Sequence, residues 1–122
     1  RDSAGGGGSI GPGGVQWMTA ASGLVHEEMH GKNFAKNGGL LEMVQLWVNL
    51  PIKDKMGPPR YQGIQDAQIP SRKLDNEAGL IRVIAGKYLE TQGPAKTFSP
   101  INLWDVRLHQ GKKNLFTVPD GH

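Results

Sequence analysis

The 122-residue chain contains no cysteine, and its charged and aromatic residues amount to only 20% and 7%. Without thiols the chain can form neither disulfides nor zinc knuckles, and it has no cysteine nucleophile. No apolar run approaches the roughly 18 residues of a membrane-spanning helix, so we expect no membrane segment. The net charge of +3 is small and the Lys and Arg residues are scattered, which argues against direct nucleic-acid binding.

Glycine and proline are abundant by comparison, with 18 and 8 residues. These two residues cost about 1 and 3 kcal/mol in the interior of a helix, so long helices are excluded. Apolar residues make up only 37% of the chain, which allows a small hydrophobic core. The composition therefore predicts short strands joined by many turns.

Apolar segments bounded by Gly and Pro mark the expected strands. In residues 40–50, Leu40, Val44 and Leu46 share one parity and Pro51 closes the run, which is typical of a strand buried mainly on one face. The stretch 31–39 is a polar loop, and the proline-rich middle looks irregular apart from a helical turn near 52–55. The expected strands cover residues 15–19, 24–30, 40–50, 80–85, 101–108 and 114–118. This pattern predicts an all-β antiparallel sandwich or barrel.

The candidate chemistry lies in His26-x-Glu28-x-His30. Side chains alternate along a strand, so these three would point to the same face. A histidine and a carboxylate two residues apart can reach one cation, and these donors suit non-haem iron, zinc or nickel. A polar, solvent-facing stripe is the alternative interpretation. His30 adjoins Gly31 at the end of the expected strand, so we expect it to be exposed and not a ligand.

Other chemical patterns are weaker. A Gly6-x-Gly8-x-x-Gly11 run has neither the preceding strand nor the following helix that a dinucleotide site needs. Glu27 and Glu28 are adjacent, so as an acid–base pair they would point apart. The three tryptophans lie in expected strands and are assigned to packing: Trp17, Trp47 and Trp104.

Whole phrases of the sequence resemble the pirin family of the cupin superfamily. They are GPGGVQWMTA at residues 11–20, GLVHEEM at 23–29, LWVNLP at 46–51 and KMGPPRYQ at 55–62. Pirins are bicupins, so the resemblance implies a cupin-type double-stranded β-helix, or jelly-roll, barrel. It assigns residues 1–50 to the C-terminal half of the first cupin and 51–79 to an irregular crossing between barrels. Residues 80–122 would then begin the second cupin.

The resemblance also implies a metal site. In the family a mononuclear metal binds to an H-x-H pair and a later H-x-E pair, and the second pair matches His26 and Glu28 here. The metal would be Fe(II), with Zn, Ni, Cu or Mn as alternatives. No H-x-H occurs in the 122 residues, so two histidine ligands are absent. A longer polypeptide or a second copy would have to complete the barrels and the site, or the site is lost.

Three functions follow from the resemblance. The first is a quercetin 2,3-dioxygenase type of oxygenase, in which Glu28 could also act as the base that takes the proton of a flavonol substrate. The second is a non-catalytic, iron-responsive binding protein that acts as a transcriptional co-regulator through a protein partner. The third is a truncated fragment without independent activity. No signal peptide is visible, so we expect an intracellular protein, cytoplasmic or, in a eukaryote, nuclear.

Overall fold

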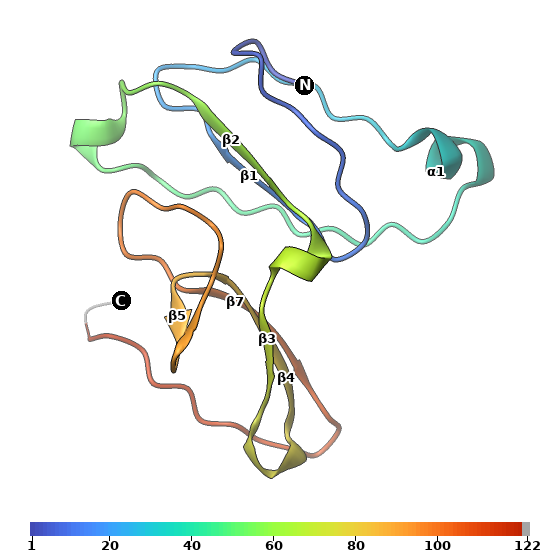
Figure 1. Ribbon diagram of the computed structural model, residues 1–122, viewed down its shortest axis with the longest axis vertical. Coiled ribbons are helices and arrows are strands. Elements are labelled where there is room, and N and C mark those ends of the chain that lie inside the picture. Colours follow the sequence, from blue (N-terminus) through green and yellow to red (C-terminus); the bar gives the residue numbers. More distant parts are fainter. Residues whose placement is uncertain (121–122) are drawn as a thin grey trace. The chain divides into compact units, whose positions relative to one another are not determined.

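Two units make up the chain in the computed structural model, which describes residues 1–120 (Figure 1). The first unit is Arg1–Asp66 and the second is Ala67–His122. Each unit has its own antiparallel strand pairing, and each is described separately below.

The first unit is built on one pair of strands. Strand β1 (Val15–Thr19) pairs antiparallel with β2 (Arg60–Ile64), so that Val15 lies opposite Ile64 and Thr19 opposite Arg60. Strand β2 begins directly after a Pro-Pro pair, where proline cannot donate to a ladder. A long excursion joins the two strands and carries helix α1 (Lys32–Asn37) and the 3-10 turn η1 (Ile52–Asp54). The candidate metal residues lie on this excursion.

The second unit contains a three-stranded antiparallel sheet in the order β3-β4-β7. Its strands are β3 (Ser71–Lys73), β4 (Gly79–Ala85) and β7 (Leu103–Leu108), and a bulge interrupts the β4–β7 register between Val83 and Ala85. A small hairpin pairs β5 (Lys87–Tyr88) with β6 (Thr91–Gln92). Two 3-10 turns complete the elements, η2 (Asp66–Gln68) before β3 and η3 (Asp75–Glu77) between β3 and β4.

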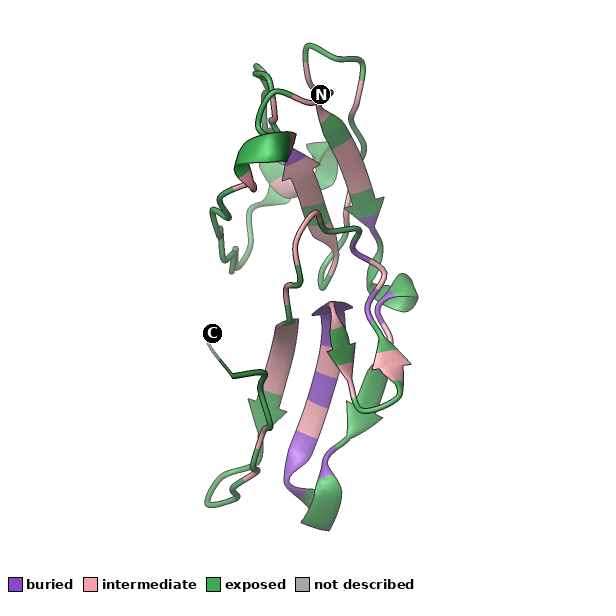
Figure 2. Ribbon diagram, turned by 90° about the vertical axis from the view of Figure 1, so that its left-hand side faces the viewer, coloured by how far each residue is buried: buried purple, intermediate pink, exposed green. Residues whose placement is uncertain are grey.

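Buried residues of the second unit gather on the central strand β4, as the colouring of the ribbon in Figure 2 shows. Ile81 and Val83 on β4 are completely buried, and β4 is paired with a strand on each edge. Leu74 and Ala78 join Ile81 in the core, and Trp104 packs against this group. The Trp104 ring lies 5.3 Å from Tyr88 and 5.9 Å from Phe116, in agreement with the packing role expected of this tryptophan. This unit therefore has a small core closed by an aromatic cluster.

The all-β class predicted from the sequence is confirmed, and three of the expected strands form. The segments 15–19, 80–85 and 101–108 correspond to β1, β4 and β7, and η1 lies within the helical turn expected near 52–55. The strand predicted over 114–118 does not form, and α1 occupies the expected polar loop 31–39. Strands β2 and β3 lie in the middle stretch that looked irregular.

Two further strand predictions were wrong. Residues 24–30 form one isolated bridge, and residues 40–50 form no ladder at all. Alternating apolar residues make a strand only where a second strand accepts the backbone hydrogen bonds, and the described part of the chain supplies no such strand to residues 40–50. Trp47 is accordingly 91% exposed and does not pack as expected. The division into halves of two barrels at residues 50 and 79 stays a prediction.

None of the helices in residues 1–120 has the length and hydropathy that crossing a bilayer would require.

Candidate functional site

His26 lies on a segment that the first residues of the chain hold extended. Asp2 and His26 form an antiparallel bridge, and hydrogen bonds flank it on both sides. The Ser3 N–H donates to the Val25 carbonyl oxygen at 2.8 Å, and the Glu27 N–H donates to the Arg1 carbonyl oxygen at 3.0 Å. The N-terminal residues therefore fix the backbone from which His26 projects.

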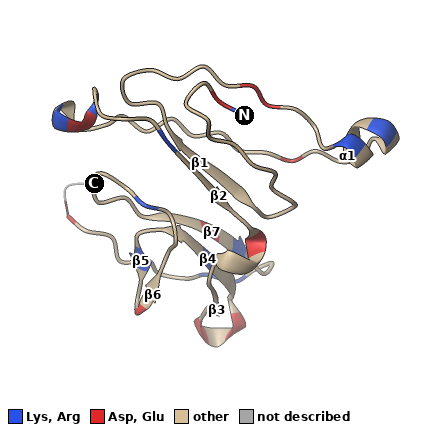
Figure 3. Ribbon diagram, turned by 45° about the horizontal axis from the view of Figure 1, so that its top comes forward, with Lys and Arg blue, Asp and Glu red and all other residues tan. Residues whose placement is uncertain are grey.

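The two candidate ligands lie side by side. His26 Nε2 is 3.9 Å from Glu28 Oε1, and the two side chains are 37% and 44% exposed. Glu27, between them in sequence, instead pairs with Arg1, whose Nη2 is 3.3 Å from its Oε1. Figure 3 shows this acidic stretch close to the N-terminus. The structure therefore brings together His26 and Glu28, the pair for which the alternation predicted a common face.

His30 does not join this pair. Its ring is exposed and lies 5.2 Å from the ring of Phe34 on α1. The expectation that His30 is an exposed residue is therefore confirmed.

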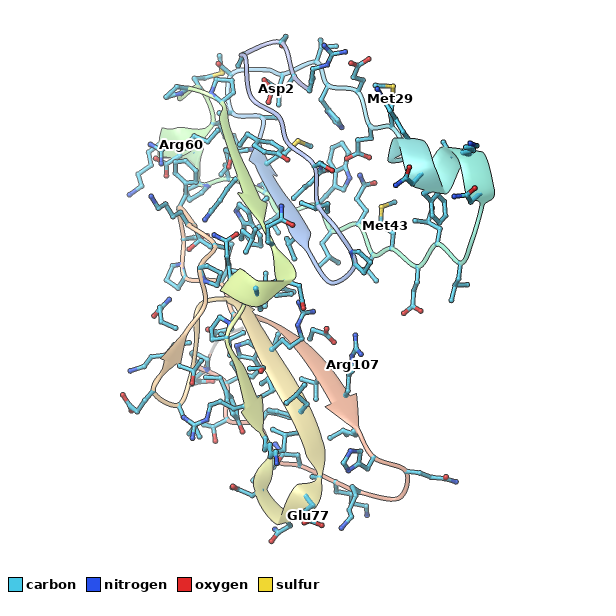
Figure 4. All side chains as sticks on the ribbon, turned by 45° about the vertical axis from the view of Figure 1, so that its right-hand side comes forward. Asp2, Met29, Met43, Arg60, Glu77 and Arg107 are labelled. Carbon is cyan, nitrogen blue, oxygen red and sulfur yellow. The ribbon has the colours of Figure 1, made fainter. Side chains whose placement is uncertain are left out.

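Asp2 is an acidic residue beside the site that carried no sequence signal. It is opposite His26 in the bridge, but its Oδ1 accepts hydrogen bonds from the backbone N–H groups of Ala4 at 2.9 Å and Gly6 at 2.8 Å. A Cβ on Gly6 would collide with the same carboxylate, so glycine allows this close approach. Figure 4 labels Asp2 in this N-terminal loop. Its carboxylate organises the loop that holds His26 and is not a third donor beside the pair.

The pair is a suitable donor set for two positions of one metal ion. Metal–nitrogen and metal–oxygen bonds of about 2.0–2.2 Å place neighbouring ligand atoms about 3 to 3.5 Å apart. Closing 3.9 Å to that range needs only small rotations of two partly exposed side chains. Across residues 1–120 no group of three or more His, Asp or Glu residues is placed to bind a metal. The described residues thus fit half of a metal centre and not a whole one.

Comparisons with known proteins agree with one another. Residues 1–48 match the family model described as Pirin. A Pseudomonas aeruginosa protein with the provisional name quercetin 2,3-dioxygenase is 60% identical over 122 residues, which are 100% of this chain and 43% of that protein. Pirin of Rattus norvegicus is 35% identical over 114 residues, or 93% of this chain and 37% of that protein.

Solved structures show the same relationship. The crystal structure of quercetin 2,3-dioxygenase from Acinetobacter baumannii superposes with a TM-score of 0.93 at 54% identity, over 99% of this chain and 42% of that one. A protein from Geobacillus kaustophilus gives a TM-score of 0.70 at 40% identity, over 84% of this chain and 39% of that one.

These matches confirm the cupin class implied by the resemblance, although the sheets within residues 1–120 do not close into a barrel. The chain spans 43% and 37% of the length of the two curated relatives. The family model, the curated relatives and the solved structures all agree with the resemblance: the chain is similar to part of the proteins of the pirin family.

Proposed function

We propose that the chain supplies half of the metal centre of a pirin-type oxygenase that cleaves a flavonol with O₂. The observation that carries this proposal is the His26–Glu28 pair, with its two donor atoms 3.9 Å apart on one face. The substrate class is supported by the quercetin dioxygenase named for the Acinetobacter structure. Because the chain spans 42% of that protein, the activity is proposed for a complete assembly and not for these residues alone.

In this proposal His26 donates a lone pair through Nε2 and Glu28 binds through its carboxylate. Fe(II) is the favoured metal, since imidazole and carboxylate donors together are typical of non-haem iron oxygenases. When bound, the metal supplies Lewis-acid and one-electron chemistry at its open positions. The remaining ligands come from polypeptide outside the described residues.

Glu28 has a second role in this proposal. Its carboxylate accepts the proton of the flavonol hydroxyl, which makes the substrate more electron-rich toward O₂. Both this carboxylate and the His26 ring are partly open to solvent, at 44% and 37% exposure. A reactive site needs more complete exclusion of water than this, so the proposal requires further polypeptide over the pair.

A chimera tests the function directly. This chain replaces the matched part of the Acinetobacter dioxygenase, where the TM-score of 0.93 favours correct folding. We expect the Fe(II)-loaded chimera to consume quercetin under air, as followed by loss of the flavonol absorbance. His26→Ala and Glu28→Gln should each lower kcat/KM at least tenfold and reduce bound iron, because each removes one ligand.

Glu27→Gln is the matched control, since Glu27 pairs with Arg1 and lies away from the proposed ligands. It should keep the kcat/KM and iron content of the parent chimera. Equal turnover by the Glu28→Gln and Glu27→Gln chimeras would refute the proposed role of Glu28. Glu28-dependent iron binding without any quercetin consumption would favour the non-catalytic binding protein instead.

A further inference from the structure

The segment that carries the candidate metal pair is held mainly by backbone pairing. Val25 and Met29, which flank the pair in sequence, are 76% and 75% exposed, so neither side chain anchors the segment to a core. Within residues 1–120, every hydrogen bond of the backbone of residues 24–30 goes to Arg1 or Ser3. The direction in which His26 projects therefore depends on the N-terminal residues.

His26 lies directly opposite Asp2 in this pairing. The backbone hydrogen bonds join the residues on either side of the two, so Asp2 and His26 form a non-hydrogen-bonded pair of an antiparallel ladder. Opposite residues approach most closely in such a pair. The Ser3 hydroxyl oxygen adds a further contact, because it accepts a hydrogen bond from the Val25 N–H at 3.1 Å. A displacement of Asp2 would therefore displace the backbone that carries His26.

Asp2 also closes the short loop 2–6 that follows it in sequence. Its Oδ1 accepts hydrogen bonds from the N–H groups of Ala4 and Gly6. Its own N–H donates to the Gly6 carbonyl oxygen at 3.0 Å, and the Gly5 N–H donates to the Asp2 carbonyl oxygen at 3.3 Å. A short pair of strands is marginally stable by itself in water, so the contacts that close this loop also stabilise the pairing of residues 1–3 with 25–27.

We propose that Asp2 is a positioning residue for the metal centre, an inference that rests on the proposed metal role of His26. The Asp2 carboxylate fixes the loop 2–6, the loop fixes the pairing with residues 25–27, and this pairing directs His26 toward the metal. Residues that orient the ligands of a metal commonly change its affinity by about 10- to 100-fold when they are mutated. Asp2 acts here through the backbone, since its carboxylate accepts hydrogen bonds from two backbone N–H groups.

Two variants of Asp2 in the chimera described above separate this role from direct metal binding. Alanine removes the hydrogen-bond acceptor, whereas asparagine keeps an acceptor Oδ1 and loses the charge. We expect Asp2→Ala to raise the dissociation constant for Fe(II) at least about tenfold, measured by competition with a chelator. Asp2→Asn should raise it by no more than about threefold, because neutral hydrogen bonds are weaker than charged ones. Equal weakening by both variants would overturn the proposal, since it would assign the effect to the charge of the carboxylate.

Hydrogen exchange in the metal-free chimera tests the positioning without metal or substrate. Asp2→Ala should speed exchange of the Glu27 amide at least about tenfold, because the hydrogen bond from Glu27 N–H to the Arg1 carbonyl oxygen opens more often. Unchanged exchange would overturn this inference alone. A parent chimera that binds no iron would instead refute the proposed function, and this inference with it.

Asp75→Ala is the matched control. The Asp75 side chain is exposed and makes no hydrogen bond or ion pair within residues 1–120, so this variant should change neither the iron affinity nor the exchange of Glu27. If Asp2→Ala does not fold, Ser3→Ala replaces it, because it removes only the acceptor of the Val25 N–H. Ser3→Ala should weaken iron binding, and Ser3→Thr should restore it. Full iron affinity in Ser3→Ala, or its loss in Asp2→Asn, would contradict the proposal.

Discussion

Gly79→Ala is expected to destabilise the Ala67–His122 unit by about 2 to 5 kcal/mol. Gly79 has φ +149°, a backbone conformation that costs a residue with a Cβ about 1–2 kcal/mol. Its Cβ would also collide with the carbonyl oxygen of Arg107 and lie 2.9 Å from that carbonyl carbon. This neighbour is backbone of β7, with Arg107 labelled in Figure 4, so relief requires moving a strand, at about 1–3 kcal/mol. Urea unfolding of the full chain measures the loss.

The Gly111→Ala variant separates the conformational cost of a positive φ from the cost of the collision with β7. Gly111 also has a positive φ, +74°, but a Cβ there would meet nothing within 4 Å. This control should lose only the conformational part, about 1–2 kcal/mol. If the two variants lose the same free energy of unfolding, then the close packing of Gly79 against β7 does not contribute to stability.

Local pattern was sufficient for three strands, β1, β4 and β7, which find their partners within the described chain. Residues 80–85 carry branched apolar residues between two glycines, and β4 spans Gly79–Ala85 with a neighbour on each edge. Residues 40–50 carry an equally strong pattern and remain unpaired. Periodicity reports which side chains prefer burial, whereas a ladder also depends on a partner that may be far away in sequence or outside the chain. Strand β2, rich in polar residues, shows the converse: pairing with β1 makes it a strand.

In the candidate site, too, the local arrangement was predictable from the sequence and the long-range contact was not. Alternation along an extended backbone was enough to predict that His26 and Glu28 share a face, and their 3.9 Å separation follows from it. Asp2 was not predictable, because its place opposite His26 arises from a contact between residues 24 positions apart that no local pattern encodes. The metal role of the pair stays a proposal, since it depends on ligands beyond the described residues.

Ile81→Ala is expected to lower the free energy of unfolding of the Ala67–His122 unit by about 2 to 5 kcal/mol. Ile81 is 0% exposed at the centre of β4, where it contacts the Leu74–Ala78 cluster under Trp104 and Phe116. Alanine removes three buried carbon atoms and leaves a cavity. Because backbone hydrogen bonds fix β4 to its two neighbouring strands, the surrounding structure can close this cavity only partly. A change of about 4 kcal/mol alters the folding equilibrium roughly a thousandfold. The midpoint of the urea unfolding transition should fall, as followed by circular dichroism.

Leu115→Ala removes the same number of carbon atoms from a side chain that is 92% exposed. It should change the free energy of unfolding by no more than about 0.5 kcal/mol. A comparable loss in both variants would mean that the stability of the Ala67–His122 unit does not depend mainly on the core that packs against β4. A large loss for Ile81 alone would show that the Ala67–His122 unit draws its stability from its own sheet.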